Sequence, residues 1–274
     1  MSPKVSVIIP TIKGREKLLE KAVESVLGQT YTDFEIIVVS NSNLMLSLND
    51  DRIHIYKLPG SNVSQARNFG IKISNGDIIA FLDDDDIWLP EKLEKQLELI
   101  KKGYDLVYSD YFEKYPDGKK VRKRTKILCG NVYNELKQRN FIPTSSVVVR
   151  KDVIDEVGGF DENLSYAEDW DLWLRIAKTH KVCGINEPLF IYRKTLPNSD
   201  KYLNIACEFI KFIQKWQEEI GESLYLQELW YLKMSGKISF ITYWRLKLYA
   251  LIFGKYESIM EITKDICNKF TSRP

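Results

Sequence analysis

Short runs of apolar, mostly β-branched residues alternate with amphipathic stretches along the first 100 residues of the chain. Continuous apolar runs of this length are typical of strands buried on both faces of a sheet. The predicted strands are Val5–Ile9, Phe34–Val39, Ile53–Lys57 and Ile78–Leu82. Apolar residues at helical spacing predict helices between them, over Leu18–Leu27, Ser64–Ile73 and Pro90–Lys101. This alternation predicts an α/β fold on a doubly wound, mostly parallel sheet.

Polar segments follow three of these strands directly. Pro10–Thr11, Ser40–Ser42 and Asp83–Asp86 each begin where a predicted strand ends. Because the carboxyl ends of parallel strands meet at one edge of such a sheet, and ligands bind there, we expect these segments to share that edge.

The pattern is less regular after residue 100. It predicts strands at Tyr104–Ser109 and Ser145–Val149, a hairpin turn at Tyr115–Gly118 and a helix over Tyr166–Lys178. From about Asp200 onward the chain is helical in pattern and rich in aromatic residues. We therefore expect one α/β domain over residues 1–200 and a helical C-terminal extension over residues 201–274.

The composition is that of a folded globular protein, with 44% hydrophobic and 28% charged residues among 274. A formal net charge of +2 gives no reason to expect a nucleic-acid partner. No secretory leader and no apolar run of the roughly 18 residues that a spanning helix needs is recognisable. These features predict a cytoplasmic protein.

The cysteine and histidine residues form no recognisable metal-binding or catalytic motif. The four cysteines, Cys129, Cys183, Cys207 and Cys267, are far apart and form no C-x-x-C pair. This spacing predicts neither a zinc site nor a disulfide framework, and it favours a reducing compartment. The two histidines, His54 and His180, belong to no motif and are interpreted as structural.

Four consecutive aspartates, Asp83–Asp86, follow a fully apolar strand. So much negative charge costs free energy unless a cation or hydrogen-bond donors offset it. Oxygen ligands select a hard cation such as Mg²⁺ or Mn²⁺, which keeps positions open for substrate phosphate. The alternative is a solvated acidic loop before the helix at Pro90, whose N-terminus favours negative charge. The position of the four aspartates directly after a buried strand favours the metal site over the solvated loop.

Other phosphate and metal motifs are excluded by their fingerprints. An EF-hand would need an oxygen ligand at Ile87 and a glycine at Trp88. No G-x-G-x-x-G follows Ile9, and no G-x-x-x-x-G-K-[ST] occurs in the chain. Dinucleotide and P-loop sites are therefore not predicted.

Five blocks of sequence, in order, resemble the family 2 glycosyltransferases, which have the GT-A fold. They cover roughly residues 3–193, and they are Val5–Thr11, Glu35–Val39, Val63–Gly70, Ile79–Pro90 and Gly158–Glu162 followed by Glu168–Trp173. The resemblance implies a Rossmann-like, mostly parallel sheet flanked by helices. It also implies a nucleotide-binding half over residues 1–100 and an acceptor-binding half over residues 101–200.

The resemblance implies an inverting glycosyltransferase that uses a nucleotide-sugar donor, a Mn²⁺ or Mg²⁺ ion and a glycan or lipid-linked sugar acceptor. Asp85 and Asp83 would hold the metal, and Asp169 would be the general base. The residues implied in donor binding are Pro10, Thr11, Ser40, Arg67, Asp83 and Asp84, and those on the acceptor side are Glu168 and Trp170. A cation on the diphosphate and a carboxylate at the acceptor hydroxyl suit the chemistry of such a displacement.

Two positions depart from the family pattern. Many members have an aspartate where Ser40 follows the second strand, and a hydroxyl is a weaker acceptor for a base N–H. Many also have a histidine shortly after a tyrosine-arginine pair, whereas Lys194 and Thr195 follow Tyr192-Arg193 here. UDP-sugar is the first expectation for the donor, and Arg193 or Lys194 are alternative sources of positive charge for the diphosphate.

Alternative functions remain open at this point. Glu168-Asp169 is also a plausible helix start with acidic residues favoured by the dipole. A non-catalytic nucleotide-sugar or carbohydrate-binding module would keep the same blocks. A sugar-phosphate nucleotidylyltransferase would need a glycine-rich loop after the first strand, and Thr11–Arg15 matches that loop poorly.

Lys119–Lys126 contains six basic residues in eight. A solvated hairpin explains this stretch, and attraction to an anionic acceptor or membrane surface is the functional alternative. The segment Ile238–Met260 combines aromatic, leucine and basic residues, which also suits peripheral contact with a membrane. Helices packed on the catalytic domain are the competing interpretation.

Overall fold

The computed structural model describes residues 4–194, 199–219, 232–239, 242–243, 246–247 and 257–271. These residues belong to two compact units. One unit contains the β-sheet and its helices, and the other contains α7 (Ser199–Trp216), α10 (Glu257–Thr271) and two short segments, Lys137–Arg139 and Asn163–Glu168. The division at residue 200 into a catalytic domain and an extension stays a prediction. Trp230, Tyr231 and Trp244 lie outside the described residues.

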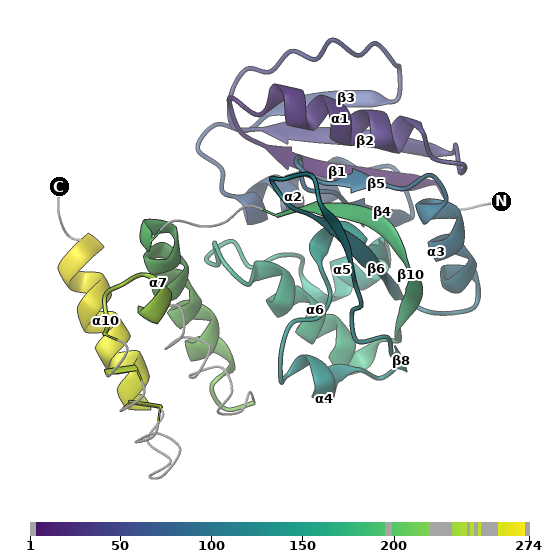
Figure 1. Ribbon diagram of the computed structural model, residues 1–274. Helices are drawn as coiled ribbons and strands as arrows, with labels where there is room; N and C mark the ends of the chain where they lie inside the picture. Colours follow the sequence, from purple (N-terminus) through teal and green to yellow (C-terminus); the bar gives the residue numbers. More distant parts are fainter. Residues whose placement is uncertain are drawn as a thin grey trace. The chain divides into compact units, whose positions relative to one another are not determined.

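The first unit is built on a ten-stranded sheet in which eight strands follow the order β3-β2-β1-β4-β9-β6-β10-β5 (Figure 1), while β7 pairs with β6 and β8 pairs with β10. Its first four strands pair in parallel, and they are β1 (Val5–Thr11), β2 (Phe34–Ser40), β3 (Ile53–Lys57) and β4 (Ile78–Phe81). The remaining strands are β5 (Ile87–Trp88), β6 (Leu106–Lys114), β7 (Lys120–Lys123), β8 (Cys129–Gly130), β9 (Val148–Arg150) and β10 (Val182–Arg193). The apolar runs thus form the parallel strands that the sequence predicts.

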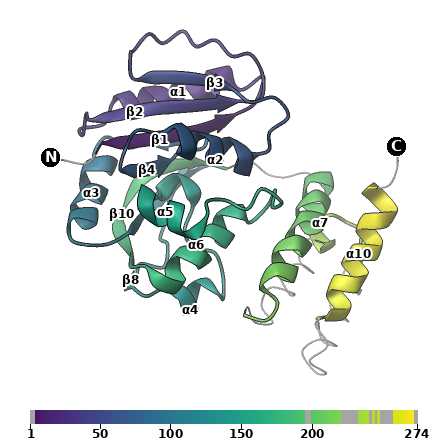
Figure 2. The same cartoon turned by 180° about the vertical axis from the view of Figure 1, so that it is seen from behind.

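Helices cover both faces of the parallel strands, as Figures 1 and 2 show from opposite sides. α1 (Glu16–Leu27) and α3 (Lys92–Lys101) pack on the face to which Val7 and Ile36 point. α2 (Val63–Ile73) packs on the other face, over Ile37 and Val39. Alternate side chains of β1 and β2 are therefore buried under different helices, which explains why these two strands are largely apolar.

The second half of the sheet departs from the sequence pattern. β10 is twelve residues long and was not predicted, because Asn186–Pro188 interrupts its apolar residues and its register with β6 shifts there. The predicted strand Ser145–Val149 begins instead with a 3-10 turn, η1 (Thr144–Ser146). The helices of this half are α4 (Tyr133–Leu136), α5 (Lys151–Val157) and α6 (Glu168–Thr179).

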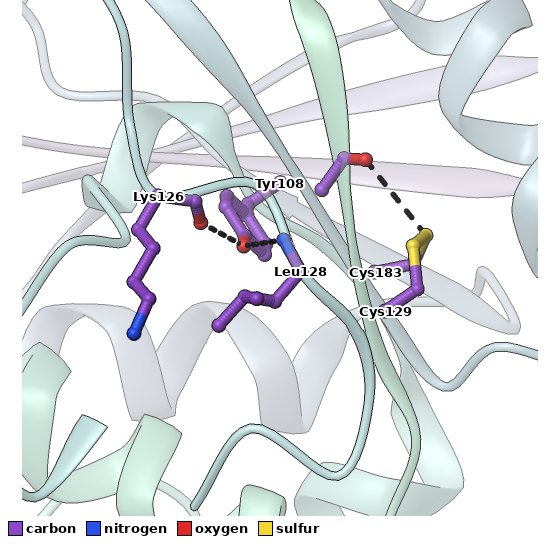
Figure 3. Close-up of a disulfide and its surroundings, with 6 residues drawn as sticks. Tyr108, Lys126, Leu128, Cys129 and Cys183 are labelled. Atoms are coloured by element: carbon purple, nitrogen blue, oxygen red, sulfur yellow. Dashed lines mark hydrogen bonds between the residues drawn. A yellow bond between two sulfur atoms is a disulfide. The ribbon is translucent and has the colours of Figure 1, made fainter. Parts of the chain in front are cut away.

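Two disulfides contradict the prediction that the cysteines are unpaired. Cys129 and Cys183 are direct partners in the antiparallel pair of β8 and β10, with Cα atoms 4.0 Å apart (Figure 3). Cys207 of α7 and Cys267 of α10 are 5.7 Å apart at Cα. Each pair is separated by more than 50 residues in sequence, so spacing alone does not reveal it. The inference of a reducing compartment loses its basis, because it depended on unpaired cysteines.

Tyr108 holds the chain segment that leads into β8. Its hydroxyl donates to the carbonyl oxygen of Lys126 and accepts from the backbone N–H of Leu128, as Figure 3 shows. The ring lies against Gly184 of β10, where a Cβ atom would come within 2.7 Å of it. A glycine at this position therefore allows the tyrosine to support the disulfide-bonded strands.

The second unit has its own buried contacts. Phe209 and Phe212 of α7 are fully buried and stack with ring centroids 5.5 Å apart. Tyr166 meets Phe209 edge-on, with ring centroids 5.8 Å apart. Among the described residues, none of the helices is both long and apolar enough to cross a membrane. Much of the segment Ile238–Met260 lies outside the described residues, so its predicted membrane contact stays a prediction.

Gly70 allows the close approach of α2 to β1, since a Cβ atom there would lie 2.7 Å from Cγ2 of Ile8. We predict that Gly70→Ala lowers the free energy of unfolding by about 2 kcal/mol, although alanine has the higher helix propensity. Denaturant unfolding measures the change. Lys72→Ala, on the exposed side of the same helix, is the control and should be nearly neutral. A Gly70→Ala variant as stable as the wild type would contradict the packing described.

Candidate active site

The carboxyl ends of β1 and β4 open onto a cleft of about 300 Å³ at the edge of the parallel strands. Residues from β1, the loop after it, the start of α2 and the loop after β4 line this cleft. They are Pro10, Thr11, Ile12, Arg15, Ser61, Asn62, Val63, Ala66, Arg67, Asp83, Asp84 and Asp85. Thr11 also lies directly opposite Ser40 in the pair of β1 and β2, so all three predicted segments share this edge, although Ser40–Ser42 does not line the cleft.

Asp84 points inward and is nearly covered, with its side chain 8% exposed. It accepts hydrogen bonds from Thr11 Oγ1 at 2.6 Å and from Arg15 Nε at 2.9 Å, and Arg15 Nη2 lies 2.6 Å from its second oxygen. Burial raises the pKa of the Asp84 carboxyl, and the bonds from Thr11 and Arg15 offset part of that rise. Asp84 thus ties the loop after β4 to the loop after β1.

Asp83 and Asp85 retain the exposed oxygens of the cluster. The side chain of Asp83 is 36% exposed and that of Asp85 is 23% exposed. Asp83 Oδ1 lies 2.8 Å from Arg67 Nη2, and Asp85 Oδ2 lies 2.7 Å from Arg15 Nη2. Each of these carboxylates therefore faces the cleft beside an arginine.

Asp86 is completely buried behind the loop. Its Oδ1 accepts from the backbone N–H of Arg193 at 3.0 Å, and its own N–H donates to the carbonyl oxygen of Asp83. Burial, followed by the nearby charge of Asp83, raises the pKa of Asp86 well above its usual range. Arg193 Nε also donates to the carbonyl oxygen of Asp85. The end of β10 consequently fixes the shape of the aspartate loop.

Helix α2 presents Arg67 to the cleft from a fixed start. Asn62 and Gln65 form a reciprocal capping box at the start of this helix. Arg67 is 3% exposed and its guanidinium lies over the ring of Phe160, 5.2 Å from the centroid. The amide of Asn68 bonds both backbone groups of Phe160. This arrangement limits the positions that the Arg67 side chain can take.

Asp169 lies at the start of α6 and is half-buried. Its Oδ2 accepts from Thr144 Oγ1 at 2.9 Å and from Asn140 Nδ2 at 3.3 Å. Its Oδ1 accepts from the backbone N–H of Trp170. Donors on both oxygens hold the carboxylate in one orientation.

The short η1 turn connects Asp169 with the aspartate cluster. Thr144 bonds Asp169, and the next residue, Ser145, accepts from the backbone N–H of Asp83 at 3.0 Å. Trp88 Nε1 in turn donates to the carbonyl oxygen of Ser145. Two adjacent residues thus position the two carboxylate groups that the sequence assigns to different roles.

Residues 6–158 match the family model described as Glycosyl transferase family 2. That match covers more than half of the chain. The chain belongs to glycosyl transferase family 2.

Relatives and a solved structure agree with this family. A glycosyltransferase of Rickettsia typhi is 32% identical over 69% of this chain, and the alignment spans 63% of the relative. The UDP-Glc:alpha-D-GlcNAc-diphosphoundecaprenol beta-1,3-glucosyltransferase WfgD of Escherichia coli is 31% identical over 66% of this chain and 73% of its own length. The mannosyltransferase PcManGT of Pyrobaculum calidifontis, in complex with GDP-Man and Mn²⁺, matches with a TM-score of 0.61 at 16% identity, covering 100% of this chain and 89% of its own. The fold is GT-A.

Several residues that the family resemblance implies lie outside the cleft lining. Ser40 is buried beside Thr11, and its hydroxyl accepts from the backbone N–H of Ser42. Trp170 is 2% exposed and donates from Nε1 to the carbonyl oxygen of Leu136, which accounts for it as a core residue. Glu168 begins α6 and is half-buried. The donor role of Ser40 and the acceptor roles of Glu168 and Trp170 stay predictions.

Arg15 is the charged residue of the cleft lining that the sequence pattern did not indicate. It was considered only as part of a loop that matches a nucleotidylyltransferase poorly, and nothing in the sequence places it against the aspartates 69 residues away. Thr144 and Asn140 were missed for the same reason. Lys194, considered as a cation for the diphosphate, instead pairs with Glu113 at 2.8 Å.

The donor set of the cleft suits a hard divalent cation that is shared with a ligand. Asp83 and Asp85 supply accessible carboxylate oxygens, and Mg²⁺ or Mn²⁺ is commonly held by one or two carboxylates together with substrate phosphates. In the part of the chain that the structure describes, no three His, Cys, Asp or Glu side chains converge to hold a metal on their own. The predicted roles of Asp85 and Asp83 as metal ligands stay predictions.

Ala167 precedes the start of α6 with a φ of 59°, a conformation that costs a residue with a Cβ atom about 1–2 kcal/mol. We predict that Ala167→Gly leaves the free energy of unfolding within about 0.5 kcal/mol of the wild type, because relief of this strain offsets the lost methyl group. Ala177→Gly, in the interior of α6, is the matched control and should lose at least about 1 kcal/mol. Equal losses in both variants, measured by denaturant unfolding, would contradict a strained Ala167.

Proposed function

We propose that the chain transfers a sugar from a nucleoside-diphosphate sugar to a hydroxyl group of a glycan or lipid-linked sugar, with inversion at the anomeric carbon. The observation that carries this proposal is the pair of carboxylate groups positioned by η1. Asp83 borders a cleft lined by arginines and bonds Ser145 through its backbone N–H, and Asp169 accepts from Thr144, the residue before Ser145 in η1. The cleft at Asp83 suits an anionic leaving group, and Asp169 suits the role of general base.

Asp169 is the proposed base. Thr144 and Asn140 donate to Oδ2 and the N–H of Trp170 donates to Oδ1, so the carboxylate is held in one orientation toward a proton from the acceptor hydroxyl. In the displacement, the acceptor oxygen forms a bond to the anomeric carbon as its proton passes to Asp169. The bond from that carbon to the diphosphate oxygen breaks, and its electron pair leaves with the nucleoside diphosphate. A single displacement of this kind inverts the anomeric centre.

Arg67 is the proposed donor-side cation of the protein. Its guanidinium is buried at the wall of the cleft and is already oriented by Asp83 and Phe160. A preorganised positive group at this place stabilises charge that develops on the diphosphate. When bound at Asp83 and Asp85, a Mg²⁺ or Mn²⁺ ion would add Lewis-acid stabilisation of the same charge. The Mn²⁺ complex of PcManGT supports this proposal by likeness of fold.

UDP is the first choice for the nucleotide. The name of WfgD specifies UDP-Glc, whereas PcManGT was solved with GDP-Man. The same E. coli relative supports a lipid-diphosphate-linked acceptor for this chain. A non-catalytic sugar-binding module and a nucleotidylyltransferase are the alternatives that an assay of transfer must exclude.

We predict that Asp169→Asn lowers kcat at least about 100-fold with UDP- or GDP-sugar donors, because the acceptor hydroxyl loses its base. Affinity for the nucleoside diphosphate, measured by calorimetry, should stay within about twofold. Asp152→Asn is the matched control, since Asp152 also begins a helix and also accepts from the next backbone N–H. Wild-type turnover in Asp169→Asn would remove Asp169 as the base, and absence of transfer by the wild-type chain would favour a binding module.

We further propose that the hairpin of β6 and β7 contacts an anionic membrane surface. Buried carboxylates neutralise part of its charge, because Arg122 pairs with Asp110 and Lys123 pairs with Glu113. Lys120 lies directly opposite Lys114, a like-charge pair that costs free energy unless an anion is near. The backbone N–H of Lys194, next to Arg193, bonds the carbonyl oxygen of Lys114, so the hairpin adjoins the aspartate loop. A bilayer on this surface would bring a lipid-linked acceptor to the site.

Charge reversal tests this contact. Lys119 and Lys120 are exposed, and we predict that Lys119→Glu/Lys120→Glu lowers binding to phosphatidylglycerol vesicles at least about tenfold in sedimentation assays. Binding should also fall steeply between 0.1 and 1 M salt, as the Debye length shrinks from about 10 Å to about 3 Å. Lys17→Glu/Lys21→Glu, on exposed positions of α1, gives the control for net charge. Equal losses in the two double variants would argue against the hairpin.

A further inference from the structure

Arg15 occupies a position where the cleft needs positive charge. Its guanidinium lies 2.6 Å from an oxygen of Asp84 and 2.7 Å from an oxygen of Asp85. The side chain is 33% exposed and lines the same cleft as Arg67. It therefore neutralises Asp84 and Asp85 while remaining accessible to a ligand.

The contacts of Arg15 with Asp84 and with Asp85 differ in how easily a ligand can replace them. Asp84 is buried, and it receives Nε and Nη2 of Arg15 as well as the hydroxyl of Thr11. Asp85 is more exposed, and Nη2 is the Arg15 atom that it contacts. The bond to Asp85 can therefore open while Nε still holds Asp84.

A divalent cation and Arg15 compete for Asp85. If a cation binds Asp85 alone, it lies beside a guanidinium, and like charges at such distances repel strongly away from bulk water. If a diphosphate enters at the same time, the released guanidinium gains phosphate oxygens that match its planar N–H donors. Loss of the Arg15–Asp85 bond is then offset only when both ligands are present.

We propose that Arg15 is a positioning residue that exchanges Asp85 for the donor diphosphate, and so makes binding of the cation and of the nucleotide depend on each other. Coupling of this kind is reciprocal, so the nucleotide raises the affinity for the cation by the same factor as the cation raises that for the nucleotide. The inference rests on the proposed function, because it concerns the same donor and the same cation.

A purely structural role for Arg15 gives the opposite prediction for one measurement. If Arg15 only holds Asp84 and Asp85 in place, Arg15→Gln should weaken binding of Mn²⁺ alone. If Arg15 competes with the cation, the same variant should bind Mn²⁺ alone more tightly, because Asp85 becomes available. The sign of the change therefore separates the two roles without any assay of turnover.

Arg52 provides a matched control. It is 34% exposed and forms the same type of fork, with Nε and Nη2 on the two oxygens of Asp50, at the surface away from the cleft lining. Arg52→Gln removes one positive charge, as Arg15→Gln does. It also removes two bonds to one aspartate, the same number that Arg15 makes to Asp84. It reports the effect of net charge on cation and nucleotide binding.

The experiment titrates Mn²⁺ by electron paramagnetic resonance, with and without saturating UDP or GDP, and titrates the nucleotide by calorimetry with and without Mn²⁺. We expect Arg15→Gln to bind Mn²⁺ alone about tenfold more tightly and to show a coupling factor about tenfold smaller than the wild type. Some coupling should persist, because a cation can contact phosphate directly. Arg52→Gln should keep the wild-type values.

Arg15→Lys gives a second test should the glutamine variant fail to fold. It retains the charge but lacks the planar fork, so Mn²⁺ alone should bind within about twofold of the wild type while the coupling factor falls. Unchanged coupling in both variants, or weaker binding of Mn²⁺ alone in Arg15→Gln, would overturn the inference. If the wild-type chain binds neither nucleotide with Mn²⁺, the proposed function itself fails, which is a different result.

Discussion

The structure around the cleft depends on how four adjacent carboxyl groups are kept together at the end of β4. Each carboxyl group is stabilised in a different way. Asp86 is buried and accepts a hydrogen bond from a backbone N–H, and Asp84 is buried and accepts hydrogen bonds from Thr11 and Arg15. Asp83 and Asp85 stay at the surface beside Arg67 and Arg15. Like charges so close repel one another, and these neighbours offset that repulsion.

These neighbours come from elements distant in sequence, and the loop therefore connects several parts of the domain. Arg15 follows β1, Arg67 belongs to α2, Ser145 belongs to η1 and the N–H of Arg193 ends β10. The parallel strands bring the first two together at one edge, while the longer β10 returns beside β6 to supply the last. The loop is thus the place where the nucleotide-binding and acceptor-binding halves implied by the family meet.

The sequence predicts the first half of this fold well, because strands buried on both faces leave continuous apolar runs such as Phe34–Val39 and Ile78–Leu82. It misses β10, whose polar interruption Asn186–Pro188 looks like a loop until β6 pairs with both sides of it. The disulfides and the contacts of Arg15 and Thr144 depend on three-dimensional proximity, which residue spacing does not encode. The aspartate motif and Asp169 could be named from the family resemblance, whereas their environments required the structure.

Thr144 and Ser145 have a consequence for how such a domain can diversify. Hydroxyl groups of two consecutive residues in one turn bond the Asp169 carboxylate and the backbone of Asp83, so the separation between these two aspartates depends on one short turn. Surfaces that recognise different acceptors can therefore change by mutation without disturbing that separation. A fixed separation between these two aspartates would let one ancestral scaffold acquire many sugar linkages.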